Sequence, residues 1–342
     1  MIQHAKPTTA ELDAALLLLD RLGVSPSDLV NGQASRPPAP TFAEYVPVVS
    51  AAVSDGTRRV YGSYWNRILD VWATRRLDEP SPSQIRELVE YTRENVVTRR
   101  NARGGRSAGE HMVAALRCLY RHAEDDNIIS AADNPARKVS KPRRLPSPRQ
   151  AVADNRLAEI NRIAGTTGND PALDTLILRL HTETACRRGG ALALRPQDLD
   201  AAQCLIYLRE KGETLRWQPV SPTLMKHLIN HAEDRAAPAT GQLLRYRDGH
   251  VITRRRYDHL WTRIGKHLPW VATQQISTHW LRHTTLTWVE RNFGYAVARA
   301  YAGHAEATGD AGTTATYVRA TTQEVACALS ELAGEAHPLA IR

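Results

Sequence analysis

The chain has 342 residues, with 45 Lys and Arg against 36 Asp and Glu, and a formal net charge of +9. Its length suits about two domains, and its hydrophobic fraction of 42% excludes a chain that is mainly disordered. No apolar run approaches the ~20 residues of a membrane span. The four cysteines form no CxxC pair, so neither a disulfide scaffold nor a zinc ribbon is expected, and a reducing, cytoplasmic setting fits best.

Residues 1–40 are predicted to be an N-terminal extension that contains one short helix. They lack the basic segment followed by an apolar stretch that marks a signal peptide. Residues 8–22 have the pattern of an amphipathic helix that opens at a Thr cap. Residues 31–40 form a Pro-rich break, which separates this helix from the rest of the chain.

Four helical patterns then predict a small all-helical domain over residues 41–136. They cover residues 41–53, 55–76, 82–97 and 107–125. In the second pattern, apolar side chains recur on one helical stripe, which predicts the face that packs into the core. This stripe consists of Val60, Tyr64, Ile68, Val71 and Trp72.

Most of the excess positive charge lies between residues 91 and 150, which carry thirteen basic and six acidic residues. Gly, Ser, Asn and Pro are mixed with these basic residues and indicate exposed loops, of which residues 137–150 are predicted to be a linker. Such clusters attract the phosphate backbone of nucleic acid; the alternative is a solvated linker that is basic by chance. The predicted DNA-binding residues are Arg99, Arg100, Arg103, Arg106, Lys138, Lys141, Arg143 and Arg144.

Residues 151–342 are predicted to form a second domain that is mainly α with one small antiparallel sheet. Helical patterns cover residues 153–164, 170–186, 222–234, 253–267, 278–292, 295–302 and 322–333. Two β-like runs, 204–209 and 215–220, flank the segment EKGE at 210–213. That arrangement is typical of a β-hairpin with Gly in its turn.

Five polar motifs follow one another in this second domain. They are TACRRGGALALRPQDLD (184–200), EKGE (210–213), HWLRHT (279–284), YAGH (301–304) and TTATY (313–317). In these motifs the sequence resembles the tyrosine recombinases, the phage-integrase type of site-specific recombinase. That family carries an Arg in a TGxRxxELxxLRWxDID box, a Lys in a β-hairpin, an HxxR box, an LGH-like turn, and a nucleophilic Tyr after paired Thr residues.

The residues at these positions suit phosphoryl transfer in DNA, which needs a nucleophile, positive charge at the non-bridging oxygens, and a proton for the leaving oxygen. Tyr317 supplies a nucleophile that can form a covalent phosphotyrosine. Arg187 and Arg282 can hold phosphate oxygens by planar, bidentate hydrogen bonds. Lys211, one of only six lysines in the chain, suits a general acid for the 5′-oxygen leaving group.

Two histidines complete the predicted catalytic set. His279 and Arg282 are three residues apart on a predicted helix, so both can face one phosphate. We expect His279 to assist proton transfer from Tyr317, and His304 to bond to a phosphate oxygen. Neither a metal nor a nucleotide cofactor is expected, because two guanidinium groups supply the charge and a phosphotyrosine conserves the bond energy for religation.

Each of these residues also has a purely structural interpretation. Arg187 alone could be a surface arginine, and Lys211 alone an ordinary turn lysine. Tyr295 and Tyr301 lie in apolar helical patterns and are expected in the core. The spacing of His279 and its neighbour four residues on can bind zinc, but Trp occupies position 280 and no third ligand is evident.

The sequence departs from the family box at two positions: Gly190 stands where the family usually has Glu, and Pro196 where it usually has Trp. The stretch between His304 and Tyr317 is somewhat longer than usual. Residues 1–40 are slightly acidic, unlike the basic arm-binding domain of many phage integrases.

The resemblance implies an enzyme, a tyrosine site-specific recombinase that cuts and rejoins DNA strands through a 3′-phosphotyrosyl intermediate at Tyr317. Residues 41–136 would be its core-binding (SAM-like) domain and residues 151–342 its catalytic domain. It would act as a homotetramer on double-stranded recombination sites, as a bacterial or phage-encoded protein that associates with the nucleoid. The helix at 322–333 is expected to dock on a neighbouring subunit, with packing on its own domain as the alternative.

Two other functions are compatible with parts of this pattern. Type IB topoisomerases and telomere-resolving enzymes use similar residues. A DNA-binding protein with a decayed active site is the other alternative, and the intact set of six predicted catalytic residues argues against it.

Overall fold

The computed structural model describes residues 8–24, 26, 38–95, 105–143, 149–210, 214–304 and 320–340. The chain divides into two compact units, Met1–Leu145 and Pro146–Arg342. Within the described ranges, no helix is both long enough and apolar enough to cross a membrane.

The predicted N-terminal helix is present as α1 (Thr9–Arg21). A capping box closes its first turn, because Thr8 accepts from the Glu11 amide while the Glu11 carboxylate accepts from the Thr8 N–H (2.7 Å). None of its side chains is buried, and Leu17 is 70% exposed. The helix therefore forms where the Thr cap predicts it, but its apolar side chains have no cover among the described residues.

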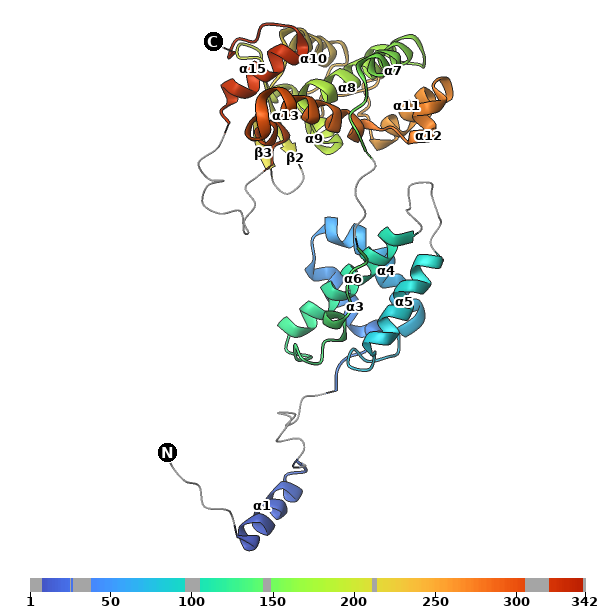
Figure 1. The fold of residues 1–342 in the computed structure, drawn as a ribbon, viewed down its shortest axis with the longest axis vertical. Coiled ribbons are helices and arrows are strands. Elements are labelled where there is room, and N and C mark those ends of the chain that lie inside the picture. Colours follow the sequence, from blue (N-terminus) through green and yellow to red (C-terminus); the bar gives the residue numbers. More distant parts are fainter. Residues whose placement is uncertain are drawn as a thin grey trace. The chain divides into compact units, whose positions relative to one another are not determined.

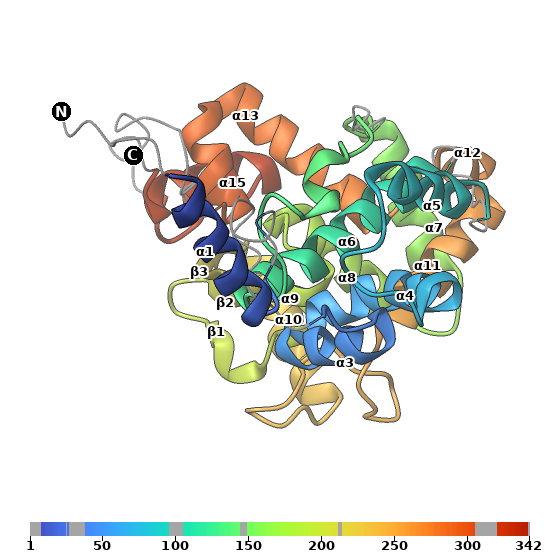
Figure 2. The same cartoon turned by 90° about the horizontal axis from the view of Figure 1, so that it is seen from below.

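The rest of the first unit packs four helices around one core. They are α3 (Phe42–Ala52), α4 (Asp55–Trp72), α5 (Pro82–Glu94) and α6 (Arg106–Asp125), followed by a 3-10 turn at Pro135–Lys138. The other three helices all contact α6, and α3 lies along α4 (Figure 2). Met112, Leu116 and Leu119 of α6 are fully buried at the centre of this core.

The buried face of α4 differs from the predicted stripe. Trp65, Ile68 and Trp72 are buried, whereas Val60 is 43% exposed and Val71 is 51% exposed. The indole N–H of Trp65 donates to a main-chain carbonyl of α6, 3.2 Å away. The helix thus turns this large aromatic side chain, with its polar partner, into the core, and the two valines of the stripe face outward.

The second unit is mainly helical and carries one three-stranded antiparallel sheet, of which Figure 1 labels β2 and β3. Its helices are α7 (Asp154–Thr166), α8 (Pro171–Thr184), α9 (Arg188–Ala193), α10 (Pro222–Asp234), α11 (Arg254–His267), α12 (Pro269–Gln274), α13 (Thr278–Ala302) and α15 (Thr322–Ala333). Its strands, in sheet order, are β1 (Leu199–Asp200), β2 (Leu205–Glu210) and β3 (Thr214–Pro219). The predicted fold class is therefore confirmed.

The β-hairpin differs from its prediction by one residue, and this shift matters for the site. Glu210 ends β2 and pairs with Thr214 of β3, instead of opening the turn. Its side chain is fully buried. The hairpin thus directs this carboxylate into the unit, at the residue that directly precedes Lys211 in the sequence.

The predicted helices at 278–292 and 295–302 form one kinked element, α13. The kink is at Gly294, which has φ 83° and ψ 171°, a conformation essentially restricted to glycine. The C-terminal helix α15 lies against α13 (Figure 1), and Leu329 is buried with Val289 and Tyr301 of that helix. In the single chain α15 packs on its own unit, so its docking on a neighbouring subunit stays a prediction.

Candidate active site

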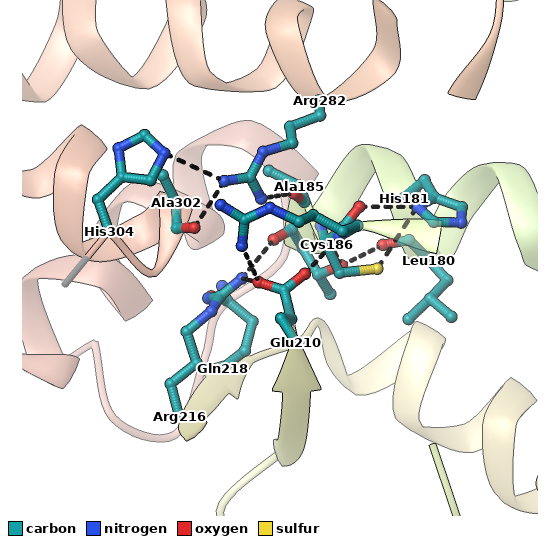
Figure 3. A network of polar contacts seen from close by, with 12 residues as sticks. Leu180, His181, Ala185, Cys186, Glu210, Arg216, Gln218, Arg282, Ala302 and His304 are labelled. Carbon is teal, nitrogen blue, oxygen red and sulfur yellow. Dashed lines mark hydrogen bonds and ion pairs between the residues drawn. The ribbon is translucent and has the colours of Figure 1, made fainter. Parts of the chain in front are cut away.

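Four of the six predicted catalytic residues lie in the described part of the chain. Arg187 is the residue before α9, His279 and Arg282 lie in the first turns of α13, and His304 follows the Gly303 cap that ends α13. Lys211 and Tyr317 lie outside the described residues. The structure brings Arg282 and His304 together (Figure 3), and Arg187 is close enough to repel the charge of Arg282.

Arg282 is held by backbone carbonyls on two sides. Its guanidinium donates to the carbonyl of Ala185 and, at 2.6 Å, to that of Ala302, and one nitrogen lies 3.5 Å from Nε2 of His304 (Figure 3). Ala185 ends α8 in the left-handed conformation, with φ 49°, as the chain turns toward Arg187. Burial, followed by repulsion from Arg187, lowers the pKa of Arg282 to about 10, so the group remains charged at neutral pH.

Arg187 is held by the carboxylate of Glu210. Its Nη1 donates to Oε2 of Glu210 at 3.1 Å, and its main-chain N–H donates to Oε1. The Arg187 side chain remains 34% exposed, whereas the Glu210 side chain is fully buried. Part of the guanidinium is therefore available to an anion while its position is fixed from behind.

A third guanidinium, that of Arg216 on β3, lies next to this pair. It is 3.8 Å from the Glu210 carboxylate, and it donates to Gln218 and to the Thr184 carbonyl. Its Nε finds no hydrogen-bond acceptor among the described residues. The Nε also lies only 2.4 Å from where a Cβ on Gly303 would stand, so a glycine is required there.

Glu210 and Arg216 are site residues that the sequence interpretation did not include. The signals for them were weak: Glu210 adjoins Lys211, and Arg216 is a charged residue within a β-like run. Neither signal shows which face of the hairpin points to the arginines, because the strand boundary decides it and the prediction placed Glu210 in the turn.

The histidines around the arginines are uncharged at neutral pH. Burial is the main cause that lowers the pKa of His279 to about 4, and Arg149 adds to it. Burial also lowers the pKa of His304, with further repulsion from Arg282 and Arg187. A neutral imidazole can accept a proton, so the positive charge of the site comes from guanidinium groups.

A buried histidine supports the turn that carries Arg187. Nδ1 of His181 lies 3.0 Å from the carbonyl of Cys186, and Nε2 lies 3.0 Å from the Tyr257 hydroxyl. Figure 3 shows His181 beside Cys186, one residue before Arg187. Burial lowers the pKa of His181 to about 4 and raises that of the Cys186 thiol to about 11, so both groups are neutral.

The tyrosines that compete with Tyr317 divide into two kinds. Tyr301 is fully buried and donates its hydroxyl hydrogen to the Glu183 carbonyl, as expected of a core residue. Tyr295 is 64% exposed on α13, so the prediction that it lies in the core is wrong. Its ring is covered by Arg299, which lies one turn later on the same helix.

The sequence analysis argued against a zinc site at His279 and His283, although their spacing could hold the metal. His279 and His283 are in ring contact, with centroids 4.9 Å apart and nearly perpendicular planes. Within the described ranges, no group of three or more His, Cys, Asp or Glu side chains could hold a metal ion.

The predicted DNA-binding residues are partly described. Arg106, Lys138, Lys141 and Arg143 are exposed, whereas Arg99, Arg100, Arg103 and Arg144 lie outside the described residues. Arg137, which adjoins Lys138, instead forms a two-point ion pair with the Glu124 carboxylate, at 2.7 and 2.6 Å.

Comparisons with known proteins give one match to a family and several to solved folds. Residues 153–324 match the model of the phage integrase family. No curated protein sequence matches the chain. The fold is similar to that of the lambda integrase tetramer bound to a Holliday junction, with a TM-score of 0.61 and 13% identity over 88% of this chain and 87% of that one. It is also similar to the Tn1549 transposon integrase in complex with circular intermediate DNA, with a TM-score of 0.61 and 15% identity over 82% of this chain and 95% of that one.

Proposed function

The chain belongs to the phage integrase family of tyrosine site-specific recombinases, and from this premise we propose that it cuts and rejoins DNA strands through a 3′-phosphotyrosyl intermediate at Tyr317. The observation that carries the proposal is the convergence of Arg187, Arg282 and His304 on one positively charged site. Such a site suits one phosphodiester whose negative charge must be stabilised during transfer.

The arginines have complementary tasks in this proposal. Arg282 is anchored by two carbonyls, so it presents a fixed positive charge. Arg187 is anchored through one edge by Glu210 and partly exposed elsewhere, so it can bind a non-bridging phosphate oxygen directly. Charge that is already in place does not need to reorganise when the pentacoordinate phosphorus forms.

The proposed chemistry balances with residues of this chain. The Tyr317 oxygen attacks phosphorus while its proton passes to neutral His279, and the bond from phosphorus to the 5′-oxygen breaks. Lys211 donates a proton to that leaving oxygen, which becomes a free 5′-hydroxyl. A 5′-hydroxyl of the partner strand then attacks the phosphotyrosine and gives its proton to Lys211. The bond from phosphorus to the Tyr317 oxygen breaks, His279 returns the proton to that oxygen, and the phosphodiester is restored.

We extend the proposal to partners and assembly. Lambda integrase is a tetramer on a Holliday junction in one similar structure, which supports a homotetramer of this chain on two double-stranded DNA sites. The exposed side chains of Lys138, Lys141 and Arg143 support contacts with the DNA backbone. In such an assembly α15 would dock on a neighbouring subunit and would lose the buried contacts that it makes within its own chain.

The location that we propose is the cytoplasm, because all four cysteines are free thiols.

The test uses a nicked suicide DNA substrate. This substrate carries the recombination site, which is identified by sequencing the DNA that flanks the gene. Wild type should give a covalent protein–DNA adduct, and Tyr317→Phe should give none. Tyr295→Phe is the matched control, because Tyr295 is an exposed tyrosine of the same unit, and it should react like wild type. An adduct with Tyr317→Phe, or none with wild type, would contradict the proposal. Relaxation of a plasmid that lacks the site would favour a type IB topoisomerase.

A further inference from the structure

Glu210 is a buried carboxylate at the edge of the site. Its side chain is fully buried although Glu210 is the last residue of β2. A buried carboxylate is costly unless hydrogen bonds and positive charge compensate it. Here the compensation comes from both the main chain and the side chain of Arg187, and from Arg216 at 3.8 Å.

Gly190 leaves the space that this carboxylate occupies. It lies in α9, three residues after Arg187. A Cβ built on Gly190 would be 2.9 Å from Cγ of Glu210 and 3.2 Å from Oε1. Any side chain at position 190 would therefore displace the carboxylate.

From these two observations we propose that Glu210 is the positioning residue of Arg187, and that position 190 is a glycine so that the Glu210 carboxylate can reach that arginine. The inference rests on the proposed function, because it assigns Arg187 to the scissile phosphate. Glu210 itself touches neither the phosphate nor the nucleophile; it acts through the guanidinium that it holds.

The arrangement has a mechanical consequence for the hairpin. Lys211, the proposed general acid, directly follows Glu210 in the chain. The Glu210 carboxylate thus links β2, which leads to the proposed proton donor Lys211, to Arg187, which is proposed to bind the phosphate. Without it, Arg187 would be left beside Arg216 and Arg282, and like charges would drive the three guanidinium groups apart.

The first experiment is a double-mutant cycle between Glu210 and Arg187, read as the single-turnover rate of adduct formation on the nicked substrate. Glu210→Ala should slow the rate by about 100-fold, as expected for a misplaced catalytic group, while binding of the same DNA is retained. In the Arg187→Ala background, Glu210→Ala should hardly change this rate further, because the arginine through which Glu210 acts is absent. Equal losses in both backgrounds would overturn the proposal.

Two further variants separate positioning from folding. Gly190→Ala keeps Glu210 but displaces its carboxylate, and should reproduce much of the loss. Asp198→Asn is the matched control, because it breaks another ion pair of a buried carboxylate with a partly exposed arginine, that of Asp198 with Arg209 of β2 at 2.5 and 2.6 Å. This control should lower the melting temperature with little effect on the adduct rate. An equally slow Asp198→Asn variant would reduce Glu210 to a structural residue and overturn the proposal.

Hydrogen exchange of the DNA-free protein tests the contact between Glu210 and Arg187 without relying on adduct formation, so its outcome is independent of the proposed function. The Arg187 amide donates to Glu210, so Glu210→Ala, which removes the acceptor, should speed its exchange while the buried amides of α8 stay protected. Unchanged exchange at Arg187 would overturn the positioning role even if wild type forms the adduct. If wild type forms no adduct but exchange responds, the proposed function fails and the contact stands.

Discussion

Histidine protonation determines how the charge of the site is built. The pKa of His279 is about 4, mainly through burial, and nearby arginines add repulsion. His304 faces Arg282 with a ring nitrogen 3.5 Å from the guanidinium, and its pKa is lowered as well. The charged guanidinium groups can therefore stabilise the phosphate, while the neutral imidazoles beside them can accept protons.

The same burial makes the second unit sensitive to acid. His181 is fully buried and His231 is 7% exposed, and each has a pKa lowered to about 4. Below the unfolded value of 6.5 the unfolded chain binds protons that the folded chain does not, so stability falls as the pH drops from 6.5 toward 4. The expected loss is about 1.4 kcal/mol per pH unit for each histidine.

Denaturant unfolding of the whole protein at several pH values between 7 and 4.5 measures this dependence. His181→Gln should remove about one proton from the slope of stability against pH. His250→Gln is the control, because its side chain is 81% exposed and its replacement should leave the slope unchanged. A stability that stays flat between pH 6.5 and 5 would contradict the role of the buried histidines.

At the scale of elements, the long helices followed from their caps and periodicity. α10 has the predicted bounds at 222–234, and α15 begins at 322 after the Thr321 capping box. The six-residue helices α9 and α12 and the two-residue strand β1 were not predicted, because they are too short to show a period.

The candidate site was predictable to the extent that motifs carry it. Arg187, Arg282 and His304 come together as the motifs indicate. The role of Glu210 was not predictable from the motifs. It depends on the pairing of Glu210 with Thr214 at the end of β2, and on the space that Gly190 leaves. A residue in a turn has no assigned face, whereas the last paired residue of a strand has one, and sequence patterns do not fix strand boundaries to one residue.

The kink in α13 is the element-scale feature with a direct test. It separates the segment that carries His279 and Arg282 from the segment whose Ala302 carbonyl returns to Arg282. Because the conformation of Gly294 is essentially glycine-only, Gly294→Ala should destabilise the protein by about 1–3 kcal/mol. It should also slow adduct formation, since the Ala302 anchor moves.

Thermal and denaturant unfolding give the stability change for this substitution. Gly189→Ala is the control, because a Cβ there would meet no atom within 4 Å and its φ lies outside the left-handed region. That variant should be neutral or slightly more stable, since alanine favours a helix by roughly 0.5–1 kcal/mol over glycine. Equal effects of the two substitutions would show that the kink does not depend on the glycine conformation.

At the scale of the whole molecule, the net charge of +9 is unevenly placed along the chain. Residues 91–150 hold thirteen basic and six acidic side chains, whereas residues 41–90 hold six and seven. Ion pairs within the chain leave this net charge unchanged but reduce the number of unpaired basic side chains, as the Arg137 pair with Glu124 does. Fewer basic side chains than the count of thirteen are therefore available to a DNA backbone, and their location can be tested.

Lys138, Lys141 and Arg143 are exposed, and each phosphate that they neutralise would release condensed counterions from the DNA. Their joint replacement by Gln should weaken binding to DNA of any sequence and reduce the slope of log K against log salt by about 0.9 for each phosphate that is no longer neutralised. Binding titrations of the full chain at several salt concentrations measure that slope. Arg137→Gln should change it little, because Glu124 already neutralises Arg137. If the triple variant keeps the wild-type slope, this segment does not touch the DNA backbone, and the positive charge that binds DNA must lie elsewhere in the chain.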